Sequence, residues 1–245
     1  MLRLLLLVLF SQIVSANAQI TRIKIDRSTD TTGEVVMRLA HRFQSYNWTP
    51  KHKFDHYDTS INSPKSVKYA LDGSKFYVQS LEGYTTSIYD AGSKRLIKTL
   101  LHGFTAESDS LFKDGETTIY NYPYKQNRKH KNVFLGKPVE SCFSHQGKYL
   151  WVTYYRRDFD PIAQSPSAVA IIDTERDVIV RVMPTGPLPK MIACSPDNKR
   201  IAVTHWGDNT VAIIDIDSDD PFDFQFVKHS VVDYKMSTEF SSSHV

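Results

Sequence analysis

The stretch that decides the fold spans residues 189–215 and reads PKMIACSPDNKRIAVTHWGDNTVAIID. Asp197-Asn198 separates two short runs, and both residue types tolerate positive φ, so the pair indicates a hairpin turn. Val211, Ile213 and Asp215 recur with a period of two, which places them on one side of a strand. The stretch therefore predicts short antiparallel strands that follow one another along the chain.

The same spacing recurs elsewhere in the sequence, which indicates an internal repeat. Counted from Pro189, the turn begins at eight residues, an apolar position lies at fourteen and an Asp closes the unit at twenty-six. Units that start at Pro64 and Pro138 have the turn and the apolar position at the same offsets, and a weaker unit starts at Ala106. The Pro138 unit closes nine residues late, so we expect an insertion within residues 155–165. The matching turns are Asp72-Gly73, Asp114-Gly115 and Gln146-Gly147.

Each unit has room for a fourth strand, which we expect at residues 95–101, 178–183 and 224–232. No sustained apolar stripe at helical spacing runs along the chain. A four-stranded antiparallel sheet that recurs about every 42 residues is the blade of a β-propeller. The sequence therefore predicts an all-β fold.

The Pro189 unit resembles the YVTN family of β-propeller repeats. The resemblance rests on Ser195-Pro196-Asp197-Asn198, on Val203-Thr204-His205 and on Asn209-Thr210-Val211, with Thr185-Gly186 before the unit. It extends over about residues 63–217 and is faint at Ala106. It departs from the family pattern at Ala202 and His205. The resemblance implies a propeller and no particular activity.

The repeats and the N-terminal segment divide the chain into four parts. We expect a signal peptide at 1–18, N-terminal strands or a partial blade at 19–62, propeller blades at 63–235 and a tail at 236–245. Four to five blades are fewer than the roughly seven that such rings usually contain, so we expect an incomplete propeller in an open arc, as a module or fragment of a longer protein. A compact small propeller is the alternative.

The N-terminus carries the features of an export signal. Arg3 precedes the apolar run from Leu4 to Phe10, and Ala16-Asn17-Ala18 forms a cleavage pattern. The apolar run is too short to span a membrane. We therefore expect a periplasmic or extracellular protein without a membrane span.

The insertion is the first candidate for contact with a partner, because loops carry function more often than scaffold does. It presents Tyr154, Tyr155, Arg156, Arg157 and Asp158. Trp206, at the end of a second strand, joins this set.

Three residues are the candidates for a metal site, if there is one: His145, His205 and Asp208. They would converge only if their loops share one rim of the propeller. Cys142 and Cys194 lie in first strands and could form a disulfide across two blades, although two buried free thiols are the favoured interpretation. The sequence gives no sign of a cofactor.

The leading functional hypothesis is an exported scaffold that binds a protein or a glycan through rim loops. A net charge of +3 does not argue for nucleic acid, and the basic run Lys125–Lys131 is interpreted as a solvated loop. The alternative is a propeller enzyme, a lactonase-like hydrolase or a quinoprotein-like dehydrogenase, with a metal or cofactor near the central channel. No catalytic motif decides between the two.

Overall fold

A computed structural model describes residues 38–44, 55–116, 132–163 and 165–232 of the chain. The segment predicted as a signal peptide, the basic run Lys125–Lys131, the predicted C-terminal tail and most of residues 19–62 lie outside the described residues. The chain divides into two units. In the smaller unit, β1 (Arg42–Gln44) and β2 (Asp55–Tyr57) pair as a two-stranded sheet.

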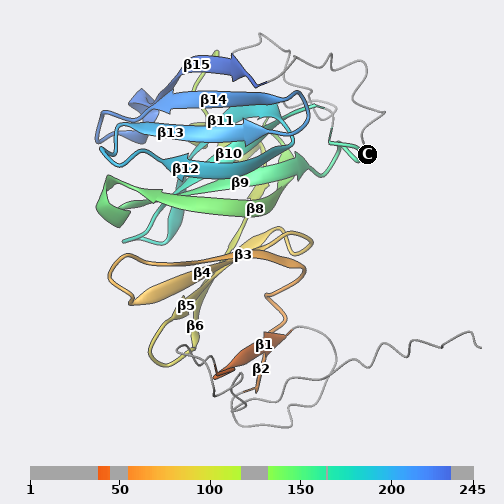
Figure 1. Ribbon diagram of the computed structural model, residues 1–245. Coiled ribbons are helices and arrows are strands. Elements are labelled where there is room, and N and C mark those ends of the chain that lie inside the picture. The colour runs from red at the N-terminus through yellow and green to blue at the C-terminus, as the bar shows by residue number, and fades with distance from the viewer. Residues whose placement is uncertain (1–37, 45–54, 117–131, 164, 233–245) are drawn as a thin grey trace, which may run out of the picture. The chain divides into compact units, whose positions relative to one another are not determined.

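The larger unit contains three antiparallel sheets, which we call blades 1, 2 and 3 (Figure 1). Blade 1 has four strands, β3 (Pro64–Tyr69), β4 (Lys75–Ser80), β5 (Thr85–Asp90) and β6 (Leu96–Leu101). Blade 3 also has four, β12 (Pro189–Cys194), β13 (Arg200–His205), β14 (Thr210–Asp215) and β15 (Gln225–Val231). In both blades the strands pair in chain order, as hairpins joined by short turns predict.

Blade 2 has the same four-stranded plan and one strand more. It contains β8 (Phe134–Ser144), β9 (Tyr149–Arg157), β10 (Pro166–Asp173) and β11 (Val178–Pro187). The short β7 (Gly103–Phe104) pairs with the start of β8 and adds a fifth strand. Between β9 and β10 lies the insertion expected from the spacing of the Pro138 unit.

The strand registers show that the three prolines occupy equivalent places. Pro64 pairs with Ser80, Pro138 with Tyr154 and Pro189 with His205, each sixteen residues further along. A register shift follows the proline in all three sheets. The repeat predicted from the sequence is therefore confirmed for these three units.

The aspartate that closes a unit has a structural role in the turn to the fourth strand. Asp90 Oδ1 accepts a hydrogen bond from the Ser93 backbone N–H at 2.6 Å, and Asp173 Oδ1 accepts one from the Arg176 N–H at 2.9 Å. Such bonds let an Asp side chain replace backbone partners where a strand ends. The closing aspartates of blades 1 and 2 are thus explained by turn chemistry, and they need no catalytic role.

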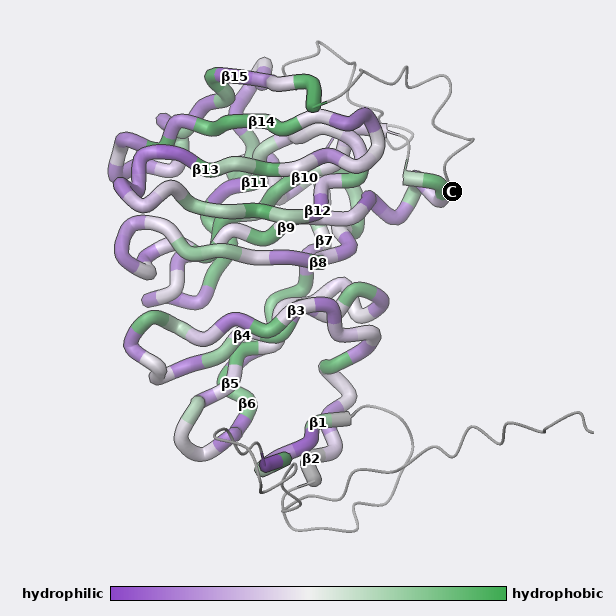
Figure 2. Tube along the Cα trace, viewed as in Figure 1, coloured by the Kyte–Doolittle hydropathy of each residue, from purple (hydrophilic) through white to green (hydrophobic). Residues whose placement is uncertain are grey.

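Two hydrophobic clusters join the blades. Between blades 1 and 2, Tyr77, Ile88 and Leu100 pack with side chains of β9, β10 and β11. Between blades 2 and 3, Trp151 and Ile201 belong to the second cluster. Figure 2 shows the hydrophobic colour along β13 and β14 and the hydrophilic colour in the turns around them. Each blade buries the apolar face of its neighbour, and the fold is an incomplete β-propeller.

The unit expected to start at Ala106 is corrected by the structure. Ala106–Leu111 forms the 3-10 helix η1, not a first strand, and the strands nearest to it belong to blade 2. The sequence AESDSL has no apolar alternation, and the Ser108 hydroxyl accepts from the Thr105 backbone N–H at 3.1 Å, as in a helix cap. The described residues therefore hold three blades, fewer than the four to five expected.

Candidate functional site

Two of the residues predicted to contact a partner are buried. Tyr154 is 0% exposed, and its hydroxyl lies 2.7 Å from His102 Nδ1 inside the molecule. Arg157 is 1% exposed, and its guanidinium lies 4.6 Å from the centre of the Phe159 ring. Because both side chains pack inward, they serve the blade and cannot touch a partner in this conformation. The prediction was wrong for these two residues.

Two more of the predicted residues hold the insertion in place. Asp158 Oδ1 accepts from the Leu135 backbone N–H at 2.8 Å. Arg156 donates from Nη1 to the carbonyl oxygens of Asp160 and Pro161. Their polar atoms are used within the blade, so the insertion offers less polar surface than its sequence suggests.

The remaining two predicted residues, Tyr155 and Trp206, meet around a lysine. Lys190 Nζ lies 5.6 Å from the centre of the Tyr155 ring and 5.3 Å from that of Trp206. Trp206 is 61% exposed. These distances are in the range in which an ammonium group is attracted to an aromatic face. We call Tyr155, Lys190 and Trp206 the rim cluster.

Blades 2 and 3 both fix the position of the rim cluster. The turn after β13 is tied down by the Trp206 N–H, which donates to the Leu188 carbonyl at 3.0 Å. Lys190 is held from blade 2, because the Thr153 hydroxyl donates to the Lys190 carbonyl at 3.0 Å. The backbones that carry the lysine and the tryptophan are therefore fixed before any ligand arrives, which lowers the entropic cost of binding.

Directly before Trp206, His205 lies in a closed hydrogen-bond network. The Gly186 backbone N–H donates to Nε2 at 3.2 Å, so Nε2 is an acceptor and the ring proton lies on Nδ1. That proton is donated to the Thr210 hydroxyl at 3.0 Å, and Thr210 donates to Asp208 at 2.6 Å. Burial lowers the pKa of His205 to about 3. The Nε2 lone pair that a metal ion would need already accepts a hydrogen bond, so His205 is not available as a metal ligand.

His145 lies at the opposite end of the strands. It follows β8, and its Nε2–H donates to the Ser218 carbonyl at 2.8 Å, beyond the end of β14. His205 contacts Thr210, the first residue of β14, so a strand about 17 Å long separates the two histidines. The predicted trio of His145, His205 and Asp208 does not converge. No group of three or more metal-ligating side chains occurs among the residues that the structure describes.

Cys142 and Cys194 lie at the same interface between blades. Both belong to the hydrophobic cluster between blades 2 and 3, Cys142 buried and Cys194 packed against it. Both are free thiols. Burial, and secondly the neighbouring Cys194, raises the pKa of the Cys142 thiol to about 12, so this thiol is not a reactive nucleophile.

Sequence reasoning missed Lys190, although a signal for the rim cluster exists. Tyr155 and Trp206 each lie seventeen residues after the proline of their unit, so they occupy the same place in successive blades. Two aromatic residues at one repeat position predict neighbouring rings on one rim. Lys190, one residue after Pro189, could then have been placed between them.

No family model matches the chain, and no curated protein matches its sequence. Several solved structures resemble it in fold. They include hydrazine synthase from Kuenenia stuttgartiensis, with 17% identity over 76% of this chain and 40% of that one, at a TM-score of 0.48. A putative 6-phosphogluconolactonase from Bacteroides uniformis has 13% identity over 71% of this chain and 42% of that one, at 0.47.

A periplasmic gluconolactonase from Pseudomonas aeruginosa has 14% identity over 71% of this chain and 41% of its own, at a TM-score of 0.46. The chain thus spans about two fifths of the length of these proteins. Similarity at this level concerns the arrangement of sheets and does not extend to activity. Within the described ranges, no helix has the length and apolar character needed to cross a membrane.

Proposed function

We propose that this chain is a binding segment of a propeller and that the rim cluster holds a carboxylate-bearing glycan. One observation carries the proposal: Lys190 lies between two aromatic rings and forms no ion pair with any described acidic residue. An exposed indole offers a flat apolar face to a sugar ring. The ammonium group beside it can donate to a carboxylate.

The charge on Lys190 separates this proposal from a protein-docking surface. Protein interfaces bury their aromatic anchors in a wide, mostly desolvated patch. The rim cluster is small, and at its centre the Lys190 ammonium group is flanked by two aromatic rings. A single acidic sugar can satisfy the ammonium and cover the indole at the same time.

Isothermal titration calorimetry with oligogalacturonate, an acidic glycan, and maltotetraose, a neutral one, tests the proposal. We expect the acidic glycan alone to bind. Lys190→Gln should weaken that binding by about tenfold or more, since a charge-assisted hydrogen bond contributes about 1.5–3 kcal/mol. Trp206→Ala should weaken it by about five- to tenfold through the loss of ring contact.

Two matched controls lie on β6, away from the rim. Lys98→Gln removes the same charge from an exposed strand, and Ile97→Ala removes apolar surface from a residue that is 48% exposed. Both should bind like the parent protein. Equal loss in Lys98→Gln, or equal affinity for the neutral glycan, would show that the rim cluster is not the site.

A propeller enzyme is the second candidate. Two of the similar solved structures are described as putative 6-phosphogluconolactonases and a third as a periplasmic gluconolactonase, so hydrolysis of a sugar lactone is the reaction to test. A pH-stat assay with glucono-δ-lactone measures the acid that ring opening releases. Turnover above the spontaneous rate that is kept in Lys190→Gln would support this candidate and separate it from the rim cluster.

We also propose that the repeats are of the YVTN type and that residues 1–18 direct export to the periplasm or the cell exterior. The matched repeat offsets support the first part, and the N-terminal apolar run supports the second. N-terminal sequencing of the secreted protein should begin at Gln19. A mature protein that still begins at Met1 would refute the export signal.

A further inference from the structure

The outer strand of each blade carries a basic residue at one equivalent position. In each blade this residue pairs in register with the isoleucine that lies two positions before the closing aspartate of the unit. The three pairs are Lys98 with Ile88, Arg181 with Ile171 and Lys228 with Ile213. Because the repeat matches the three basic side chains, a difference in what they bind reflects a difference in what covers each strand.

Blade 2 shows what binds at this position when the strand is covered. Arg181 is 0% exposed, and its Nη2 donates to Glu116 Oε1 at 2.7 Å. Glu116 ends the stretch 106–116, which we call the covering segment and in which η1 lies against β11. Leu111 of this segment and Ile179 of β11 pack against the same hydrophobic cluster. An acidic segment with an apolar side chain therefore covers the outer strand of blade 2.

The outer strand of blade 1, β6, has no such cover. Lys98 is exposed and forms no ion pair with any acidic residue that the structure describes. Beside it, Leu96, Ile97 and Leu101 are 44%, 48% and 58% exposed. Within the described ranges, β6 is the last strand of its sheet and pairs with β5 alone. An open strand edge with apolar side chains is a place where another chain can bind.

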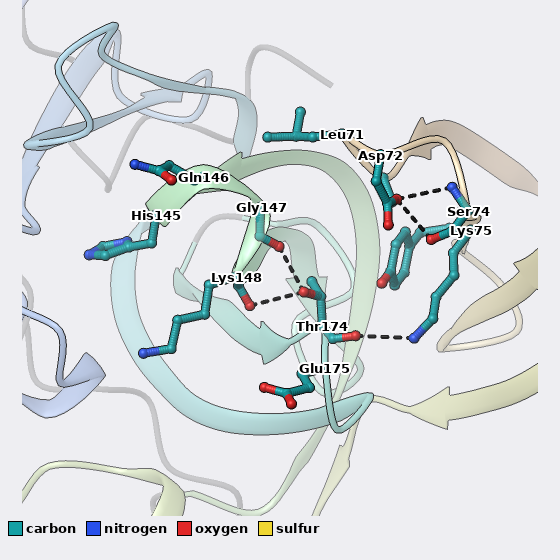
Figure 3. Close-up of a pocket in the computed structure, with 12 residues that line it drawn as sticks. Leu71, Asp72, Ser74, Lys75, His145, Gln146, Gly147, Lys148, Thr174 and Glu175 are labelled. Atoms are coloured by element: carbon teal, nitrogen blue, oxygen red, sulfur yellow. Dashed lines mark hydrogen bonds between the residues drawn. The ribbon is translucent and has the colours of Figure 1, made fainter.

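Hydrogen bonds between blades 1 and 2 fix the place of β6. Figure 3 shows Lys75, at the start of β4, reaching across to the turn after β10. Its ammonium group donates to the Thr174 carbonyl at 3.1 Å and to Asp177 Oδ2 at 2.7 Å. The Thr174 hydroxyl in turn donates to the Gly147 carbonyl at 2.7 Å. Blade 1 is thus held against blade 2 before any partner arrives, which lowers the entropic cost of binding.

We propose that β6 docks an acidic, partly apolar segment of another protein, as β11 docks the covering segment of its own chain. A carboxylate of the partner pairs with Lys98 as Glu116 does with Arg181, and its apolar side chains cover Ile97. Charge selects such a partner, because residues 91–101 contain three basic residues and no acidic one. The same charge disfavours a second copy that pairs β6 with β6, since like charges on facing strands are destabilising.

Fluorescence anisotropy with a labelled peptide and the full chain tests the proposal. The peptide has the sequence of residues 105–116, TAESDSLFKDGE, and supplies the expected chemistry. The chain's own segment should stay on β11, because a tethered segment has an effective concentration on the order of millimolar. We expect the peptide to bind the parent protein. A peptide whose four acidic side chains are replaced by amides should bind about fivefold more weakly or worse.

Substitutions in β6 locate the peptide. Lys98→Glu should weaken binding by about tenfold or more, because like charges then face each other. A peptide that carries Glu116→Lys should recover affinity for the Lys98→Glu protein. Ile97→Ala should weaken binding of the original peptide by about three- to fivefold through lost apolar contact.

Lys65→Glu is the matched control, since it makes the same charge change at an exposed lysine of β3. It should bind like the parent protein. No binding to the parent, equal binding of the amide peptide, or an equal loss in Lys65→Glu would overturn the proposal. A parent protein that sediments as a dimer, with Ile97→Asp as a monomer, would show that a second copy covers β6 instead. Lys190→Gln should not change peptide binding, so this proposal and the rim cluster can fail separately.

Discussion

Acid should destabilise this protein through two buried histidines. His102 and His205 are 0% and 2% exposed, and burial lowers the pKa of each ring to about 3. In the unfolded chain both rings titrate near the ordinary value of about 6.5. Between these two values the unfolded state binds more protons, so stability is full above about pH 6.5 and falls as pH falls towards 3. At pH 5 the loss is about 2 kcal/mol for each ring, or about 4 kcal/mol together.

The other titratable groups with a shifted pKa do not cause a similar loss of stability between pH 7 and pH 5. The carboxylates with lowered pKa, those of Asp72, Asp90, Asp173 and Asp197, lose their contribution only below the ordinary value of 3.8. Burial raises the pKa of Glu116, which has the opposite sign and offsets part of the loss near its own titration.

Urea unfolding at pH 7 and pH 5, followed by tryptophan fluorescence, measures the difference in the free energy of unfolding. In His205→Gln the pH-dependent part should shrink by about half, since one of the two rings is gone. His102→Gln should give the same reduction. The reasoning fails if the parent protein loses less than about 1 kcal/mol, or if both variants keep the full loss.

Two further predictions concern packing and thiol chemistry. Gly136→Ala should destabilise the protein by about 1–3 kcal/mol in urea unfolding, because the new Cβ would lie 2.5 Å from the ring of Tyr154; Gly92→Ala, where the nearest atom is 3.5 Å away, is the control and should change little. In the native protein, iodoacetamide should modify Cys194 faster than Cys142, since Cys142 is buried and its pKa is raised to about 12. Mass spectrometry of timed samples measures both rates, and equal rates would contradict the burial of Cys142.

The repeat could be predicted from the sequence because turn chemistry and alternation are local. Pro64, Pro138 and Pro189 have equivalent pairing partners, as their spacing predicts. The prediction of a unit at Ala106 was wrong, because Asp114-Gly115 is a turn signal that also occurs outside a blade. A turn dipeptide indicates a change of chain direction, whereas strands on both sides of it must be shown by alternation.

The candidate site could be predicted less well, because side-chain direction depends on packing between blades. Tyr154 and Tyr155 are neighbours in the sequence, yet one is buried and the other lies beside Lys190. Successive residues of a strand face opposite sides, so a cluster of five neighbouring candidates must divide between the core and the surface. Nothing in the repeat position of Arg157 indicates that its guanidinium group is buried against aromatic rings.

The position of the rim cluster within the repeat explains why it is open to a ligand. Where matched residues of successive blades lie in the core, one unit fills the space that its neighbour leaves, and nothing remains for a ligand. At the rim, Tyr155 and Trp206 do match, but they lie one residue beyond the position that is buried as Tyr154 and His205. Binding in such a fold is therefore expected at repeat positions just outside the core, and these positions can be found by aligning the repeat units of a sequence.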